Sequence, residues 1–126
     1  MLSLDGNTAP YLMYSYARCR SIQRKGDASK SIANLAVVGP FERALVMQLI
    51  RFGAVVATAT HAYRPNLLCD YLYETANVFN RFYREQRVLN AATESDKERR
   101  LSLVEATARV LERGFDMLGI EPLDRM

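Results

Sequence analysis

Histidine and cysteine are scarce in this 126-residue chain, which has one histidine, His61, and two cysteines, Cys19 and Cys69. A metal site needs several convergent ligands, and a Ser–His–Asp system would have to use His61, which has no nucleophile motif beside it. We therefore expect neither a metal site nor a catalytic residue, and we expect His61 to be an exposed or capping residue. The cysteines are far apart among apolar neighbours, which favours buried free thiols in a reducing compartment.

Signals for nucleotide binding and for membrane insertion are also missing. The sequence has no Gly-x-Gly-x-x-Gly and no P-loop, so nothing predicts a cradle for a nucleotide phosphate. Gln48 and Arg51 interrupt the most apolar stretch, residues 44–60, which we therefore expect to fall short of a membrane span. The chain contains no Gly/Ser linker and no evident repeat, so we predict a single domain over residues 1–126 without a membrane partner.

What the chain does contain is a pattern of four helices. Hydrophobic residues make up 49% and charged residues 25%, which is typical of globular domains, and the net charge of +3 permits nucleic-acid binding without requiring it. No segment shows sustained strand alternation, so we predict an all-α fold, an antiparallel bundle of four main helices. The predicted helices cover roughly residues 8–25, 39–60, 65–85 and 95–118.

The second and third of these segments differ in how their apolar residues are arranged. The second is apolar on most sides, with Phe41, Leu45 and Leu49 on one face and Met47 and Ile50 on the other, which predicts a central position in the bundle. The third has a predicted core face of Leu68, Tyr71, Leu72, Thr75, Phe79 and Phe82. Its predicted solvent side carries Asp70, Asn77, Asn80, Arg81 and Arg84.

The last segment has clear start and stop signals. Ser95 and Glu98 have the spacing of a capping box, and Gly119 with Pro122 predicts the end of the helix. Its predicted core residues are Leu101, Val104, Ala108, Leu111, Phe115 and Leu118. Its basic residues, Arg99, Arg100, Arg109 and Arg113, alternate with Glu98, Glu105 and Glu112, which predicts a solvated, ion-paired face.

Tyrosines combined with arginines are the candidate binding feature. Tyr11 and Tyr14 share a helix face with Arg18, next to a predicted core arc of Leu12, Ser15, Cys19 and Ile22. Tyr83 ends the third helix beside Arg81, Arg84 and Arg87. Such rings suit stacking on unpaired bases, but spacing alone favours the simpler interpretation that they finish the edge of the bundle.

Three segments of the chain resemble arginyl-tRNA synthetases. Residues 1–14, MLSLDGNTAPYLMY, are similar to the stretch that enters the anticodon-binding domain of that family, close to M-L-S-x-D-G-x-T-x-P-Y-L-Q-Y-x-x-x-R. Residues 65–83 resemble its third-helix signature, from Pro65 through Phe79-Asn80 to Phe82-Tyr83. Residues 118–126, LGIEPLDRM, resemble its C-terminus, and the three matches follow one another in the family's order.

This resemblance implies a helical domain that binds the anticodon loop of arginine tRNA, largely at the middle base. By position, the implied contacts come from Tyr11, Tyr14, Tyr83 and the terminal Met126, and the neighbouring Arg18 and Arg87 complete the predicted anticodon-binding set. Met13 stands where the family often has Gln, and Ser15-Tyr16 where it often has Ala-His. These departures leave the stacking tyrosines in place.

The resemblance also implies that the chain is part of a longer ligase. The family's catalytic domain needs a His-x-Gly-His motif, which a chain with one histidine cannot contain, and its N-terminal domain for the tRNA elbow is unmatched. We therefore expect a fragment without cofactor and without activity of its own, whose parent enzyme uses ATP with Mg²⁺. Its expected partners are arginine tRNA and the catalytic domain of the same polypeptide, in a cytoplasmic monomer.

A second hypothesis is a helical protein-interaction domain without an RNA role, in which the apolar second helix is exposed rather than central. The position of the tyrosines discriminates between the two. Convergence of Tyr11, Tyr14, Tyr83 and the C-terminus on one exposed, positive face favours RNA binding. Tyrosines that point inward or to separate sides favour docking of a protein.

Overall fold

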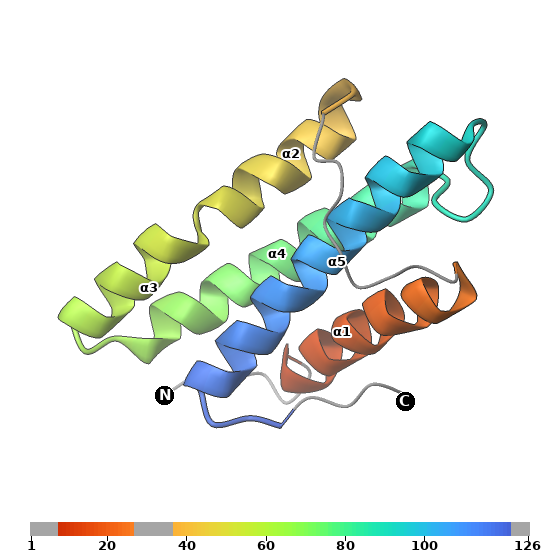
Figure 1. Ribbon diagram of the computed structural model, residues 1–126. Coiled ribbons are helices and arrows are strands. Elements are labelled where there is room, and N and C mark those ends of the chain that lie inside the picture. Colours follow the sequence, from red (N-terminus) through yellow and green to blue (C-terminus); the bar gives the residue numbers. More distant parts are fainter. Residues whose placement is uncertain (1–7, 27–36, 122–126) are drawn as a thin grey trace.

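The chain folds into an antiparallel arrangement of helices around two long central ones (Figure 1). The computed structural model describes residues 8–26 and 37–121. Within these ranges the helices are α1 (Thr8–Lys25), α2 (Gly39–Ile50), α3 (Phe52–His61), α4 (Pro65–Glu85) and α5 (Glu94–Met117). Helices α4 and α5 cross the middle, α1 packs on one side of them, and α2 and α3 pack on the other. The predicted all-α fold of four helices is confirmed, with the second helix divided into α2 and α3.

Helix α4 has the boundaries and the core face that its sequence predicts. Its six predicted core residues, from Leu68 to Phe82, are all buried. The prediction that Asn80 lies on the solvent side is wrong: only 8% of this residue is exposed, because its amide is paired with side chains of α1. Pairing removes the penalty that normally keeps an amide out of a core.

A side chain of α4 interrupts the helix between α2 and α3. The hydroxyl of Tyr71 donates a hydrogen bond of 2.5 Å to the carbonyl oxygen of Gln48, which in an unbroken helix would accept from the backbone four residues later. Arg51 instead donates its N–H to Gln48, and the ladder resumes when the N–H of Val55 bonds to the carbonyl of Arg51. A side chain inserted into the ladder is a recognised cause of a helix break.

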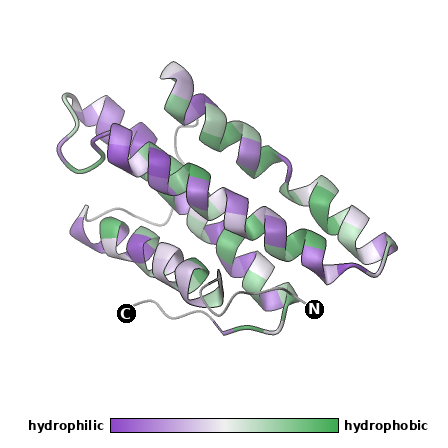
Figure 2. Cartoon of the chain, turned by 180° about the vertical axis from the view of Figure 1, so that it is seen from behind, coloured by the Kyte–Doolittle hydropathy of each residue, from purple (hydrophilic) through white to green (hydrophobic). Residues whose placement is uncertain are grey.

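Helices α2 and α3 lie at the edge of the molecule, so the prediction of a central second helix is wrong. Only Glu42, Leu45, Gln48 and Ala59 are buried along them. Hydrophobic residues recur along both helices (Figure 2), and large ones such as Met47 and Ile50 are exposed. By length and composition alone the 39–61 stretch could cross a membrane, contrary to our expectation from Gln48 and Arg51, but its inner face packs on α4.

The ends of α5 are set by two local motifs. Its N-cap is Thr93, whose hydroxyl accepts from the N–H of Asp96 at 3.0 Å, so the predicted capping box at Ser95 and Glu98 is wrong by two residues. At the other end the N–H of Ile120 bonds to the carbonyl of Phe115, and Gly119 adopts φ +74°. This is a Schellman motif, and it confirms Gly119 as the stop.

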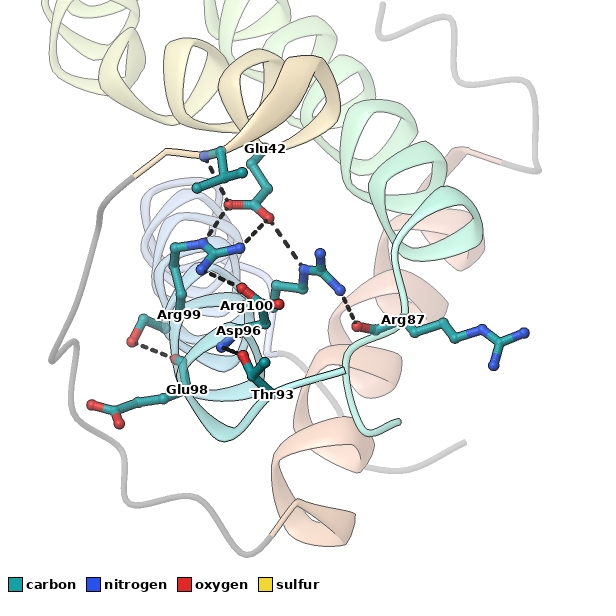
Figure 3. A network of polar contacts seen from close by, with 9 residues as sticks. Glu42, Arg87, Thr93, Asp96, Glu98, Arg99 and Arg100 are labelled. Carbon is teal, nitrogen blue, oxygen red and sulfur yellow. Dashed lines mark hydrogen bonds and ion pairs between the residues drawn. The ribbon is translucent and has the colours of Figure 1, made fainter. Parts of the chain in front are cut away.

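A buried ion-pair network ties the first turn of α2 to α5 (Figure 3). Glu42 is fully buried and accepts hydrogen bonds from Arg99 at 2.8 and 3.1 Å, from Arg100 at 3.1 Å and from the N–H of Val38 at 3.2 Å. Glu105 is also buried and pairs with Arg20 and Arg109. The predicted pairing within α5 is confirmed for Arg109 with Glu105, whereas Arg99 and Arg100 pair with Glu42 of α2. The prediction that this face is solvated is wrong for Arg99 and Glu105.

Candidate nucleic-acid interface

An open hollow of about 610 Å³ lies between α1, the end of α4 and the connector that follows α4. Two of the predicted tyrosines and the predicted arginine of α1 meet in it. It is lined by Tyr14, Ala17, Arg18, Ser21, Ile22, Arg24, Lys25, Tyr83 and Leu89. Residues far apart in the sequence thus form one concave surface that presents two aromatic rings and three cations.

Arg18 stands between the two tyrosines. Its guanidinium carbon lies 5.0 Å from the ring centroid of Tyr14 and 5.4 Å from that of Tyr83, which are cation–π distances. The same group donates to the hydroxyl of Tyr14 and to the side-chain oxygen of Asn80, both at 3.0 Å. The guanidinium is therefore held in one orientation by contacts from α1 and α4.

Asn80 connects the residues of this site to one another. Its amide oxygen accepts from Arg18, and its amide nitrogen donates to the hydroxyls of Tyr11 at 2.9 Å and Ser15 at 3.1 Å. Sequence reasoning missed this role, since the helical period alone placed Asn80 on the outer side of α4. An Asn one residue after a core Phe is the only local signal that the sequence offers.

Tyr11 lies beside the hollow rather than in it. Its hydroxyl donates to the side-chain oxygen of Asn77 at 2.7 Å, and its ring packs against that of Tyr73 with centroids 5.4 Å apart. Tyr14 is half exposed, at 50%, whereas Tyr83 is partly buried and stacks on the core residue Phe79. The three tyrosines therefore lie along the same α1–α4 seam, linked through Asn80.

Arg87, like Tyr11, is a predicted site residue that does not line the hollow. The side chain of Arg87 is exposed and points away from the ion-pair network in Figure 3, while its carbonyl oxygen accepts from Arg100 at 2.6 Å. Met126 lies outside the described residues, so its predicted contact stays a prediction.

The charge of this hollow distinguishes it from a second hollow on α1 and α5. Among the described residues that line it, three are cationic and none is acidic. The second hollow mixes both signs and is lined by Arg20, Glu105, Arg109, Glu112 and Arg113. A concave surface of one sign attracts ligands of the opposite sign, here anions such as phosphate.

The cysteines and the histidine stand apart from this site. Cys19 and Cys69 are buried free thiols, as predicted, and burial raises the pKa of both. His61 is exposed at the end of α3, also as predicted. These groups behave as structural residues, which leaves the tyrosine–arginine hollow as the feature with binding chemistry.

Comparison with known proteins gives the family context. The family model described as "DALR anticodon binding domain" matches residues 12–126. Over its full length the chain is 47% identical to the arginine–tRNA ligase of a Synechocystis species and 39% identical to that of Yersinia pseudotuberculosis. In both cases it covers 22% of the relative, so the chain spans about a fifth of the length of the curated relatives it matches.

Solved structures agree with these sequence relatives. The fold superposes on Thermus thermophilus arginyl-tRNA synthetase with a TM-score of 0.86 and 36% identity, over 98% of this chain and 22% of that one. Against arginyl-tRNA synthetase from Plasmodium falciparum the TM-score is 0.79 at 26% identity, with the same coverage.

Proposed function

Since this chain belongs to the DALR anticodon-binding domain family, we propose that it binds the anticodon loop of arginine tRNA and positions that tRNA for aminoacylation. Its catalytic partner in this proposal is a domain of the same polypeptide, which uses ATP with Mg²⁺. The relatives that the chain matches are arginine–tRNA ligases several times its length, which supports an assignment of the chemistry to sequence outside these 126 residues. We further propose a monomer that acts in the cytoplasm.

The observation that carries the proposal is the meeting of Tyr14, Arg18 and Tyr83 in one cationic hollow. An anticodon loop presents unstacked bases, which proteins bind by stacking on tyrosine rings and arginine planes. Its phosphates favour a surface that carries several cations. The hollow offers both kinds of contact within the reach of one nucleotide chain.

The proposal is tested with a stem–loop RNA that carries the anticodon of an arginine tRNA, and with the same RNA changed at the middle base. We expect the chain to bind the first more tightly, and to bind both more weakly as salt is raised. Tyr83→Ala is expected to weaken binding of the matched loop by about 1–3 kcal/mol through the absence of stacking. Tyr63→Ala, a control at a tyrosine that is 92% exposed on the α3–α4 turn, is expected to leave it unchanged. Equal affinity for both loops would exclude the base-specific proposal.

The alternative, a protein-interaction domain without an RNA role, is favoured by one observation. Met47 and Ile50 expose large apolar side chains on α2, at 56% and 69%. This hypothesis predicts no affinity for the matched stem–loop above that for an unrelated hairpin. It also predicts a concentration-dependent increase in apparent mass that Met47→Ser with Ile50→Ser abolishes, measured by sedimentation.

A further inference from the structure

We propose that the hollow binds one RNA strand at its two ends, with a base against Tyr14 and Tyr83 and a phosphate of the same strand at Arg24 and Lys25. This inference rests on the proposed function and extends it. It assigns RNA-backbone recognition to Ser21, Arg24 and Lys25, which the anticodon-binding set of tyrosines does not include. Three features support it: the spacing along α1, the packing of the opposite wall, and the charge.

The wall formed by α1 changes in character along the helix. Tyr14, Arg18, Ser21 and Lys25 follow one another at spacings of four, three and four, so they form one stripe. With a rise of 1.5 Å per residue, Arg18 and Lys25 are about 10 Å apart along the axis. The stripe therefore leads from an aromatic end at Tyr14 to a cationic end at Lys25 in about three turns, and Arg24 adds a second cation at that end.

The opposite wall is fixed by packing at the cationic end. The wall opposite α1 is formed by Tyr83 at the aromatic end and by Leu89 of the connector at the cationic end. A Cβ on Gly26 would lie 3.0 Å from Leu89 and 3.1 Å from Leu101, so the end of α1 is in close contact with both. Arg100 holds the same connector by donating to the carbonyl of Arg87. Close packing thus fixes the backbone at the end of α1, which carries Arg24 and Lys25, relative to the connector that carries Leu89.

The charged side chains at the two ends of the hollow differ in how they are engaged by neighbouring residues. The guanidinium of Arg18 already donates to Tyr14 and Asn80 and faces both rings, which suits contact with a base. Arg24 and Lys25 are exposed, and Ser21 adds a hydroxyl between them and Arg18. Cations in a last turn also stabilise a helix end. That effect needs no particular neighbour, whereas here the cations line the same hollow as the two rings.

The experiment compares two double variants that remove equal charge. Arg24→Gln with Lys25→Gln alters the cationic end, and Arg43→Gln with Arg113→Gln, exposed residues of α2 and α5, is the control. Binding of the arginine-anticodon stem–loop and of its middle-base variant is measured over a salt series. We expect the first variant to bind both RNAs about tenfold more weakly at low salt, by the same factor for each. Its salt slope should fall by about 0.7 for each phosphate that the variant no longer neutralises, with a smaller change in the control.

Each result decides between the two proposals. If the wild-type chain discriminates the middle base and the Arg24/Lys25 variant matches the control, the phosphate site is excluded while the anticodon proposal stands. If the Arg24/Lys25 variant loses more affinity for one of the two RNAs than for the other, these cations contact the middle base. That result would also exclude the phosphate site. If the wild-type chain binds neither RNA above an unrelated hairpin at low salt, the proposed function fails and this inference with it. Thermal melting shows whether each variant is folded.

Discussion

The two flanks of α4 face different kinds of neighbour. Towards α1, side chains of α4 form a hydrogen-bonded seam with tyrosine and arginine, centred on Asn80. Towards α2 and α3, the contact is mainly apolar, and the ion pairs of buried Glu42 with Arg99 and Arg100 connect α2 to α5. Helix α1 is the more polar in sequence, yet it is the better buried of the two flanks. The apolarity of a helix therefore does not measure how central it is.

The largest expected effect on stability comes from removing the buried carboxylate that connects α2 to α5. Glu42→Ala leaves buried Arg99 with Asp96 as its remaining carboxylate partner, which is expected to lower the free energy of unfolding by about 3 kcal/mol in denaturant titrations. Arg43→Ala, at the neighbouring exposed position, is expected to change it by less than about 0.5 kcal/mol. If Glu42→Ala were as mild as this control, the network would not be what holds α2.

Acidification should act on the same flank. Burial by itself would raise the pKa of Glu42, but the hydrogen bonds from Arg99 and Arg100 outweigh it and lower that pKa below its ordinary value. The unfolded carboxyl has a pKa of about 4.3. Stabilisation by Glu42 is therefore complete above that pH and is lost as the pH falls through the lower pKa of the folded state.

Denaturant titrations of wild type and Glu42→Gln from about pH 7 to about pH 3 measure this loss. We expect the difference in stability between the two proteins to narrow towards low pH. A difference that stays constant, or widens, would show that the charge of Glu42 does not contribute in this way.

On the α1 flank, Asn80→Ala is expected to act on both stability and binding. It leaves the donors and acceptors of Arg18, Tyr11 and Ser15 without their shared partner, which is expected to cost about 1–3 kcal/mol of stability. Discrimination of the middle anticodon base should fall with it, because Arg18 loses its fixed orientation.

Asn77→Ala is the matched control for Asn80, since it removes one exposed hydrogen bond to Tyr11 and leaves Arg18 untouched. We expect it to keep base discrimination. Should Asn80→Ala lower stability while discrimination is retained, Asn80 would be a packing residue without influence on the site.

The smallest expected effect is on the outer face of α2. Met47→Ser with Ile50→Ser changes side chains that are mostly exposed, so stability should change by less than about 0.5 kcal/mol for each. RNA affinity should not change, because neither residue lines the tyrosine hollow. A loss of RNA affinity in this variant would contradict the proposal that RNA binds only on the α1 flank of α4.

How far the sequence predicts this structure differs between its parts. The core face of α4 and the end of α5 follow from helical periodicity and from Gly119, which are local signals. The position of α2 and α3 does not, since an apolar helix shows the same pattern whether its outer side is covered or open. Nor does the break at Arg51, which depends on a hydroxyl from Tyr71 on another helix.

The candidate site divides in the same way. Tyr14, Arg18 and Tyr83 are identified by spacing and resemblance, and the structure places all three in one hollow. Asn80 is not identified from the sequence, because its burial depends on three partners in α1 that are more than sixty residues away in sequence. The RNA-binding roles of all six predicted residues stay predictions, those of Tyr11, Tyr14, Arg18, Tyr83, Arg87 and Met126. The stripe from Tyr14 to Lys25 is visible in the sequence but carries meaning only with Tyr83 and Leu89 opposite.

The fixed guanidinium of Arg18 has a consequence for the entropy of binding. An unrestrained arginine side chain carries about 2 kcal/mol of rotamer freedom, which is lost when it is immobilised on a ligand. Here two hydrogen bonds and two ring faces remove that freedom while the protein is still unliganded. The conformational entropy of the Arg18 side chain is therefore lost when the protein folds. Binding of a base to this surface then requires no further ordering of that side chain.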